Sequence, residues 1–529
     1  MIKIYKNLLK KNKLYLQLFS FYSLSHIWII FLSNSLFWDD WHLFITNPEQ
    51  LDLYWKMLGA PIRGFMIKSL FPFGFYSFRF ITFIVIFING VLLDKILKRI
   101  EIFNENNRFI ICLIFLIAPF YIDRITIICF PYTLCTFLFF SAWYLRPQKK
   151  FLSFVLFIIS FSTNSLLVFY ALPNLENFYT NYSLERKSIL RFLKNNFIFL
   201  IVPFLYFLLK KLLFKPYGLY EGYNNWFSLK SLFLTPFYQL IDTLDFKTSF
   251  VLILPIIVMI FSYVFYKYIP LKASKTDSKY SRLIFIIGIF SLFFGLFPYW
   301  ILNHIPSFGR EWMSRHQLLM PLGISLITSS VLSKFDLSSR RVFLALIVSI
   351  SLIINVSNYF DLIKDYKKQI EITNVMSNYR IRDNIDVIIF DDQTKSFNAF
   401  NRSYRYYEWQ GIINNAYPNK KEIIALNSIN NLEFLNNLFN GKCQKIYGYK
   451  RINLPEKINV SKIRISKQEN LTNASFLHKF FNLIFYKDFH NGYQIQETEF
   501  GQIKRNDLFE KSSNEWTTKN SNNFKCMID

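Results

Sequence analysis

The feature that most constrains this chain is a series of apolar runs, many of them about 20 residues long, separated by short basic segments. A helix of that length covers the ~30 Å hydrocarbon core of a bilayer at 1.5 Å per residue. Hydrophobic residues make up 52% of the chain and charged residues only 18%, which excludes an ordinary soluble enzyme and any disordered or fibrous class. The sequence therefore predicts an α-helical polytopic membrane protein.

About eleven spans are expected. The first run, Leu14–Phe37, lacks the small-residue cleavage site of a secretory signal, so we expect it to be retained as a span. The run Phe151–Tyr179 is broken by the polar residues Ser162–Ser165, which predicts a hairpin of two short helices. The other expected spans are Tyr76–Leu97, Phe109–Ile122, Ile125–Leu145, Phe197–Leu213, Ser249–Tyr268, Leu283–Leu302, Leu318–Leu332 and Val342–Phe360.

Basic residues set the expected orientation. The formal net charge of +26 could favour nucleic acid, but many of the bases lie between apolar runs, as the positive-inside rule requires. We therefore expect contact with membrane lipids, no nucleic-acid partner, a cytoplasmic N-terminus and an external C-terminal tail. Scarce glycine with abundant Asn, Lys and Ile is typical of an AT-rich genome, which suggests a bacterial inner (plasma) membrane.

A change of composition near residue 360 predicts two domains, a transmembrane domain of residues 1–360 and a soluble domain of residues 361–529. The soluble domain is expected to be a small extracytoplasmic α/β domain. Its predicted elements are buried strands at Asp386–Phe390 and Glu422–Leu426 and helices near Arg402–Asn415 and Asn431–Phe439. Asp391 and Asp392 follow the first strand, where a turn is favoured over a metal or acid pair.

The sharpest local signal is the segment Phe37-Trp38-Asp39-Asp40-Trp41-His42 at the end of the first run. Adjacent carboxylates are costly at a bilayer boundary and repel each other. Flanking Trp residues are typical of the membrane interface. One interpretation is that the acids end a helix and face water. The functional interpretation is a general base, or a carboxylate that positions substrate, held at a fixed depth.

Further candidates lie in the expected external loops. A lipid-linked phosphate leaving group develops negative charge, which Arg groups stabilise. The candidates for this role are Arg63, Arg124, Arg310, Arg315 and His316. Snorkelling or lipid head-group contact explains single members equally well. Tyr220 and Tyr223 lie in an aromatic loop that suits stacking on sugar rings, although interfacial anchoring is the alternative.

Metal chemistry is not predicted from the cysteines, because the five are not clustered as zinc ligation requires. No cofactor is therefore assigned. Binding of a divalent cation near the acidic pair is left as an alternative.

The acidic pair Asp39-Asp40 directly after the first span, followed by many spans and an external C-terminal domain, resembles the GT-C superfamily of membrane glycosyltransferases. The short helices near Pro119 and Asn164 also resemble the middle region of that fold. The resemblance implies transfer of a sugar from a polyprenyl-phosphate carrier to a glycan, lipid or protein acceptor at the outer face, in surface glycan or glycolipid modification. It also implies that the first acid, Asp39, is the base, and Asp40 would then orient the acceptor, the substrate-binding candidate His42 or a bound cation. The soluble domain departs from the best-known members, so no subfamily or metal site is implied.

Two other classes compete. A transporter or flippase predicts ionisable or polar groups deep in the spans, whereas Asp94 and Asp123 lie near span ends. This disfavours ion-coupled transport and leaves a lipid or polysaccharide flippase as the alternative. A polysaccharide polymerase or ligase of another membrane fold usually depends on a large Arg-rich outer loop, and the loops here are modest. A glycosyltransferase is therefore favoured.

Overall fold

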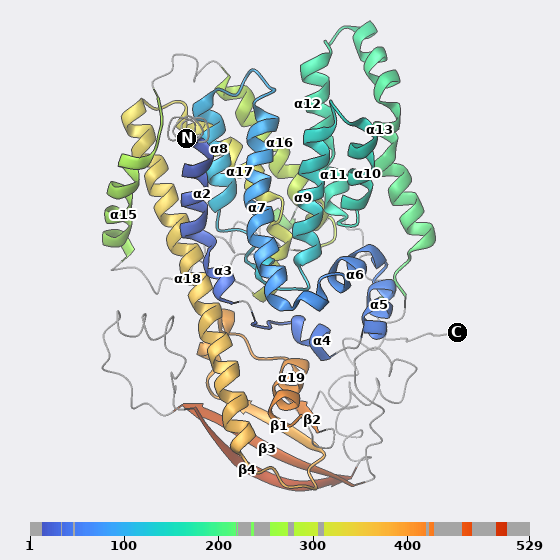
Figure 1. Ribbon diagram of the computed structural model, residues 1–529, viewed down its shortest axis with the longest axis vertical. Coiled ribbons are helices and arrows are strands. Elements are labelled where there is room, and N and C mark those ends of the chain that lie inside the picture. The colour runs from blue at the N-terminus through green and yellow to red at the C-terminus, as the bar shows by residue number, and fades with distance from the viewer. Residues whose placement is uncertain are drawn as a thin grey trace, which may run out of the picture. The chain divides into compact units, whose positions relative to one another are not determined.

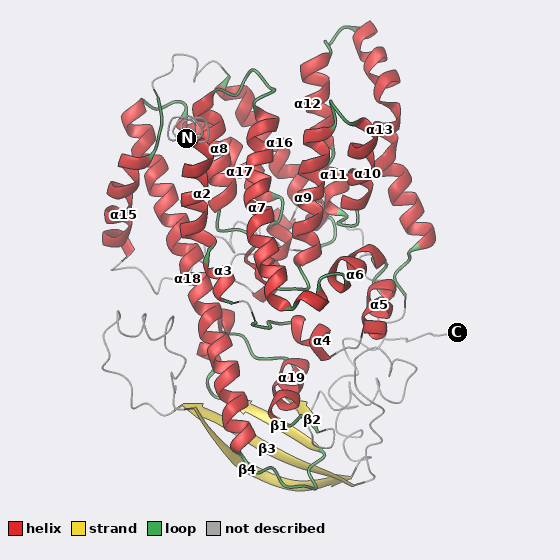
Figure 2. Cartoon of the chain, in the orientation of Figure 1, coloured by secondary structure: helices red, strands yellow, loops and turns green. Residues whose placement is uncertain are grey.

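The structure is a computed structural model that is mostly helical, with a small sheet near the C-terminus (Figures 1 and 2). It describes residues 13–32, 34–45, 48–217, 220, 234–236, 254–272, 280–304, 311–418, 423–427, 457–467 and 493–504. The chain forms two compact units. The helical unit holds Met1–Ser33, Ser69–Phe214 and Asn224–Asn358, and the sheet unit holds Asn34–Lys68, Lys215–Tyr223 and Tyr359–Asp529.

Four described helices are long and apolar enough to cross a membrane, which supports the membrane class expected from the sequence. They are α7 (Phe75–Leu97), α13 (Arg186–Leu213), α16 (Ser281–Trp300) and α18 (Leu337–Asn378). Shorter apolar helices are α9 (Phe130–Leu145), α10 (Lys150–Ser160) and α17 (Met320–Leu332). The other helices of this unit are α2 (Lys13–His26), α3 (Trp28–Phe31), α8 (Glu105–Ile117), α11 (Ser165–Phe169), α12 (Ala171–Asn181) and α15 (Leu254–Tyr268).

The break predicted at Ser162–Ser165 is confirmed, because α10 ends at Ser160 and α11 begins at Ser165. The first run was expected to form one span. In the structure it is divided at Ile27 into two helices, α2 and α3. Helix α8 also ends five residues before its expected limit. The residue before a proline is disfavoured in the α region, so Ala118 ends the helix ahead of Pro119.

The early end of α8 leaves backbone carbonyls inside an apolar bundle, where each unsatisfied group is expensive. Polar side chains from other helices fill this need. His26 Nε2 lies 3.1 Å from the Leu116 carbonyl, and Asn355 Nδ2 donates to the Ile117 carbonyl at 2.7 Å. These contacts join α2 and α18 to the C-terminal end of α8. The early end of α8 is therefore stabilised by side chains of two other helices.

Helices α16 and α17 approach closely because each has a glycine that faces the backbone of the other helix. A Cβ on Gly323 would lie 2.6 Å from the Leu292 backbone nitrogen, and one on Gly288 would lie 2.8 Å from Ile327. The pair begins and ends the loop that contains the 3₁₀ helix η5 (Glu311–Gln317), so its packing fixes the ends of that loop.

The sheet unit contains four strands in the order β2-β1-β3-β4. Strands β1 (Val387–Asp392), β2 (Ile424–Leu426) and β3 (Lys457–Lys467) are parallel, and β4 (Tyr493–Lys504) is antiparallel to β3. Val387 lies opposite Ile424 on one side and Val460 on the other. The end of α18 and helix α19 (Tyr406–Ala416) lie against one face of this sheet (Figure 1). The same unit contains α4 (Asp40–Ile45), α5 (Pro48–Met57) and α6 (Pro61–Lys68).

The two strands and the first helix expected in the soluble domain are confirmed, with bounds shifted by a few residues. The helix expected at Asn431–Phe439 lies outside the described residues. Strands β3 and β4 were not predicted from the sequence. Asp391 and Asp392 are the last residues of β1, and the expected turn follows at Gln393 and Thr394, where the Thr394 backbone N–H donates to Asp392 at 2.8 Å. Asp391 pairs with Arg464 across the sheet.

A buried ion pair fixes α18 to the sheet. The Lys368 ammonium, with no exposed surface, donates to both oxygens of Asp392 at 2.9 and 2.8 Å, to the Thr394 carbonyl and to Asn398 Oδ1. Burial acts to raise the pKa of Asp392, but Lys368 and Thr394 more than offset this effect and hold that pKa below its ordinary value. Because the ammonium and the carboxylate both have hydrogen-bond partners, the pair can be buried.

Candidate functional site

The acidic segment belongs to the sheet unit and turns sharply before α4. Trp38 has a positive φ of 50°, a region that few residues other than glycine adopt. Its backbone N–H donates to Glu408 Oε1 at 3.3 Å. Asp40, fully buried, is the first residue of α4, and the backbone N–H of Phe37 donates to its carboxylate. Asp39 is half-buried, so it is the acid of the pair with the larger exposed fraction.

Helix α19 supplies the partners of this segment. The Tyr407 hydroxyl donates to Asp39 Oδ1 at 2.6 Å. Burial and the neighbouring Asp39 hold the pKa of Tyr407 well above its ordinary value, so the phenol stays protonated. Glu408 has no exposed surface and accepts two hydrogen bonds of 2.5 Å from Arg402 and one of 2.9 Å from the Arg405 backbone.

Aromatic rings surround His42, the third polar residue of the segment. Its ring lies 5.5 Å from that of Tyr54 and 6.1 Å from that of Tyr407. Burial lowers the pKa of His42 to about 4, so the ring is neutral near pH 7. Tyr220, one of the two expected sugar-stacking residues, packs edge-on against Tyr54 at 5.5 Å. Asp39, His42 and Tyr220 are thus brought into one region of the sheet unit.

Arg63 also lies in the sheet unit, on the short helix α6. It is 8% exposed, so most of its surface is covered by protein. The next residue, Gly64, allows close packing of α6 on α5, because a Cβ there would lie 2.9 Å from that of Trp55.

Two loops of the helical unit meet at Asp123. This buried carboxylate accepts a hydrogen bond of 2.8 Å from the Ser314 hydroxyl and another of 2.8 Å from the Arg315 backbone. Asp123 belongs to the 3₁₀ helix η2 (Ile122–Ile125), and both partners belong to η5. The link places Arg124, Arg315 and His316 in one part of the helical unit.

The His316 ring stacks on that of His304 at 4.9 Å and packs at a tilt of 39° against that of Tyr299, also at 4.9 Å. Burial and the nearby Arg315 hold the pKa of both histidines below the ordinary value. Arg315 Nε donates to His316 Nε2 at 3.4 Å, which leaves the proton of the neutral ring on Nδ1. That buried Nδ1 has no hydrogen-bond partner among the described residues.

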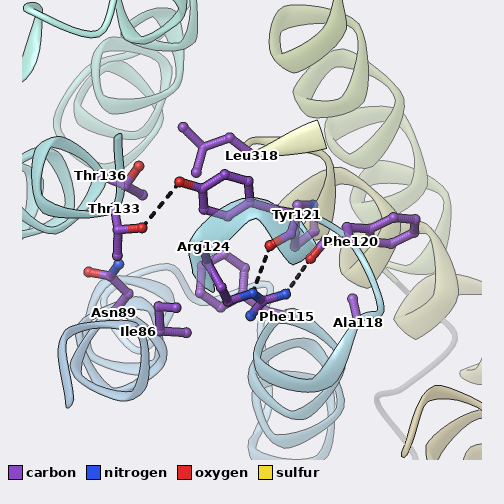
Figure 3. Close-up of a pocket in the computed structure, with 11 residues that line it drawn as sticks. Ile86, Asn89, Phe115, Ala118, Phe120, Tyr121, Arg124, Thr133, Thr136 and Leu318 are labelled. Atoms are coloured by element: carbon purple, nitrogen blue, oxygen red, sulfur yellow. Dashed lines mark hydrogen bonds between the residues drawn. The ribbon is translucent and has the colours of Figure 1, made fainter. Parts of the chain in front are cut away.

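Arg124 lines a cavity of about 40 Å³ in the helical unit (Figure 3). Its Nε donates to the Tyr121 carbonyl at 2.8 Å, and its Nη2 donates to the Phe120 carbonyl. Thr133 and Asn89 add polar atoms to the wall. This volume suits about two or three water molecules and is too small for a sugar ring. The guanidinium group of Arg124 therefore stabilises the backbone at Phe120 and Tyr121, just after α8, in this conformation.

Arg310 and Tyr223 lie outside the described residues. No group of three or more His, Cys, Asp or Glu side chains that could hold a metal ion occurs in the described part of the chain. Models of known protein families, curated proteins and solved structures were each compared with the chain, and none matches it.

Sequence reasoning missed Tyr407 and Glu408 as partners of the acidic segment, and Arg402 as the partner of Glu408. They lie more than 360 residues away in sequence, and no local pattern joins them to Asp39. Asp123 carried a weak signal, because a carboxylate next to Arg124 at the end of an apolar run is costly without partners.

Proposed function

We propose that the chain is a GT-C-like membrane glycosyltransferase with about eleven spans. It moves a hexose or related sugar from a polyprenyl-phosphate carrier to a glycan, lipid or protein acceptor at the extracytoplasmic face. The N-terminus is cytoplasmic, and the C-terminal domain is outside, in a bacterial inner membrane. The proposal is supported by four helices apolar enough to span a bilayer together with a partly exposed carboxylate in a rigid setting.

The observation that carries the proposal is the difference between Asp39 and Asp40. Asp39 is half-buried and hydrogen-bonded to a neutral phenol, whereas Asp40 is fully buried at the start of α4. A general base must be reached by the group whose proton it takes. Asp39 meets this condition better, so it is the base, and Asp40 fixes the turn that presents it.

In the proposed reaction, Asp39 takes the proton of the acceptor hydroxyl as that oxygen attacks the anomeric carbon of the donor. The bond from the anomeric carbon to the phosphate oxygen breaks, and the polyprenyl phosphate leaves with the electron pair. A single displacement of this kind inverts the anomeric configuration. The leaving phosphate is bound by cationic and neutral N–H donors. Arg124 is occupied by backbone carbonyls, so the sequence candidates that stay for this role are Arg63, Arg310, Arg315 and His316. Tyr220 and Tyr223 are the sequence candidates for stacking on sugar.

The proposal is tested in a deletion strain. The strain should lose one sugar from its surface glycans or glycolipids and regain it with the wild-type chain, whereas the Asp39→Asn chain should not restore it. Tyr417→Phe is the matched control, because its hydroxyl bonds to the backbone of Met376 and Tyr379 rather than to the acidic segment. An unchanged glycan profile in the deletion strain would contradict the proposal.

Orientation is tested separately with reporter fusions after Lys149, Lys275 and Asn440. The first two should report cytoplasm and the third the outside. A cytoplasmic signal after Asn440 would place the acidic segment's partner domain on the wrong side for an external transferase.

A further inference from the structure

Two adjacent side chains of α19 hold the acidic segment on both sides of Asp39. Tyr407 donates to the carboxylate itself, and Glu408 accepts the backbone N–H of the residue before it. Both residues belong to the C-terminal domain, so this domain contacts the acidic segment directly. We infer that Tyr407 and Glu408 are positioning residues for Asp39, so that the C-terminal domain completes the catalytic site. This inference rests on the proposed role of Asp39 as base.

Glu408 explains how Trp38 keeps a left-handed backbone conformation. A non-glycine residue persists at positive φ only where its surroundings over-determine it. The carboxylate of Glu408 is itself fixed, because both of its oxygens receive hydrogen bonds from Arg402 and the group has no exposed surface. A rigid acceptor at this place selects the turn that directs the next residue, Asp39, toward Tyr407.

Packing fixes the same geometry independently of the hydrogen bonds. Trp41 lies directly over Gly411 of α19, where a Cβ would come within 2.0 Å of the indole ring. Helix α4 therefore contacts α19 through a site that only glycine leaves open. The acidic segment thus has three points of attachment on one helix, namely Glu408, Tyr407 and Gly411.

The Tyr407 hydroxyl has an expected chemical effect as well as a geometric one. It donates to the carboxylate of Asp39, and a hydrogen-bond donor favours the ionised form of an acid. It also limits rotation of the carboxylate group. A base that is ionised and correctly oriented before the acceptor arrives needs less reorganisation during the reaction.

The test compares full-length Tyr407→Phe with wild type, in membranes of the deletion strain at equal protein level. The probe is a panel of radiolabelled polyprenyl-phosphate hexoses, and released polyprenyl phosphate is measured. We expect kcat to fall roughly 10- to 100-fold with little change in the donor KM. The acidic limb of the pH–rate profile should move to higher pH, because the ionised base has lost a donor. Tyr417→Phe, which removes a hydroxyl bonded to main chain of the same domain, should change neither.

The other outcomes are also decisive. If Asp39→Asn is inactive while Tyr407→Phe keeps the wild-type rate and pH profile, the positioning role is wrong and the proposed function stands. If Asp39→Asn retains full activity, the proposed function fails first. If Tyr407→Phe is not recovered folded, Glu408→Gln carries the test. Its amide has a single acceptor oxygen, so the two hydrogen bonds from Arg402 that fix the acceptor of the Trp38 N–H cannot both form, and a wild-type kcat there would overturn the inference.

Discussion

Replacing Gly411 by Ala tests the contact that joins α4 to α19. The new Cβ would lie 2.0 Å from Cε3, 2.6 Å from Cζ3 and 2.9 Å from Cδ2 of Trp41. Those atoms belong to a rigid ring that is only 4% exposed, so the ring has little room to move. We expect the substitution to push α4, and with it the acidic segment, away from its position.

Two opposing effects set the magnitude. Overpacking a buried contact costs about 1–3 kcal/mol, and a clash this severe belongs at the upper end. Alanine gains about 1 kcal/mol over glycine in a helix interior. The net loss in the free energy of unfolding is therefore about 2 kcal/mol. For a domain of this size it corresponds to roughly 4–8 °C in the melting temperature of the sheet unit.

The assay is thermal unfolding of the detergent-solubilised chain, followed by tryptophan fluorescence. Gly501→Ala is the matched control, because no atom of the described residues beyond its two chain neighbours lies within 4 Å of its Cβ position, and we expect no loss of stability there. In a Trp41→Ala background the clash is absent, so Gly411→Ala should become neutral or slightly stabilising. An equal loss in both backgrounds would refute the proposed contact.

Three further predictions concern charge and hydrogen bonding. Because burial lowers the pKa of His42 to about 4 from an ordinary ~6.5, the stability of the sheet unit should be full above that ordinary value. It should fall by about 3 kcal/mol as the pH drops to 4, and His42→Asn should flatten melting temperatures across this window. Lys368→Met should cost about 3–5 kcal/mol near pH 7, because it leaves the buried Asp392 carboxylate without its counter-ion. Acidification through the carboxyl range should reduce this cost, as urea unfolding at several pH values would show. Asp123→Asn should cost roughly 1–3 kcal/mol by disturbing the bond from Ser314, measured as faster proteolysis of the η5 loop, and unchanged cleavage would contradict it.

Much of the helical unit could be predicted because long apolar runs have few alternatives to the helix. The runs at Tyr76–Leu97 and Leu283–Leu302 match α7 and α16 closely. The break between α2 and α3 carried no comparable signal, since Ile27 is apolar and the run Leu14–Phe37 contains neither proline nor glycine. Strands β3 and β4 were missed. Strand β3 buries Ile458 and Val460 on one face and Ser461, Ile463 and Ile465 on the other, so its buried positions do not keep one period of two. In β4 the register shift opposite Lys462 and Ile463 adds an extra residue, Thr498, which breaks the alternation there.

The candidate site was predictable only in part. The acidic pair stands out locally, because two carboxylates beside tryptophans at the end of an apolar run are costly and therefore indicate a function. The groups that hold it belong to α19, and only the folded chain brings them to Trp38 and Asp39. The difference between the two acids, one half-buried and one fully buried, also depends on that packing.

The central claim is that Asp39 takes the proton of the acceptor as the sugar is transferred. The most direct measurement is the rate at which purified chain releases polyprenyl phosphate from a radiolabelled donor in the presence of acceptor membranes. Asn has nearly the shape of Asp but cannot take the proton, so Asp39→Asn should keep its melting temperature within a few degrees and lose on the order of 10²–10⁴-fold in rate. Full transfer activity in both Asp39→Asn and Asp40→Asn would contradict the account, because the acidic pair would then only end a helix.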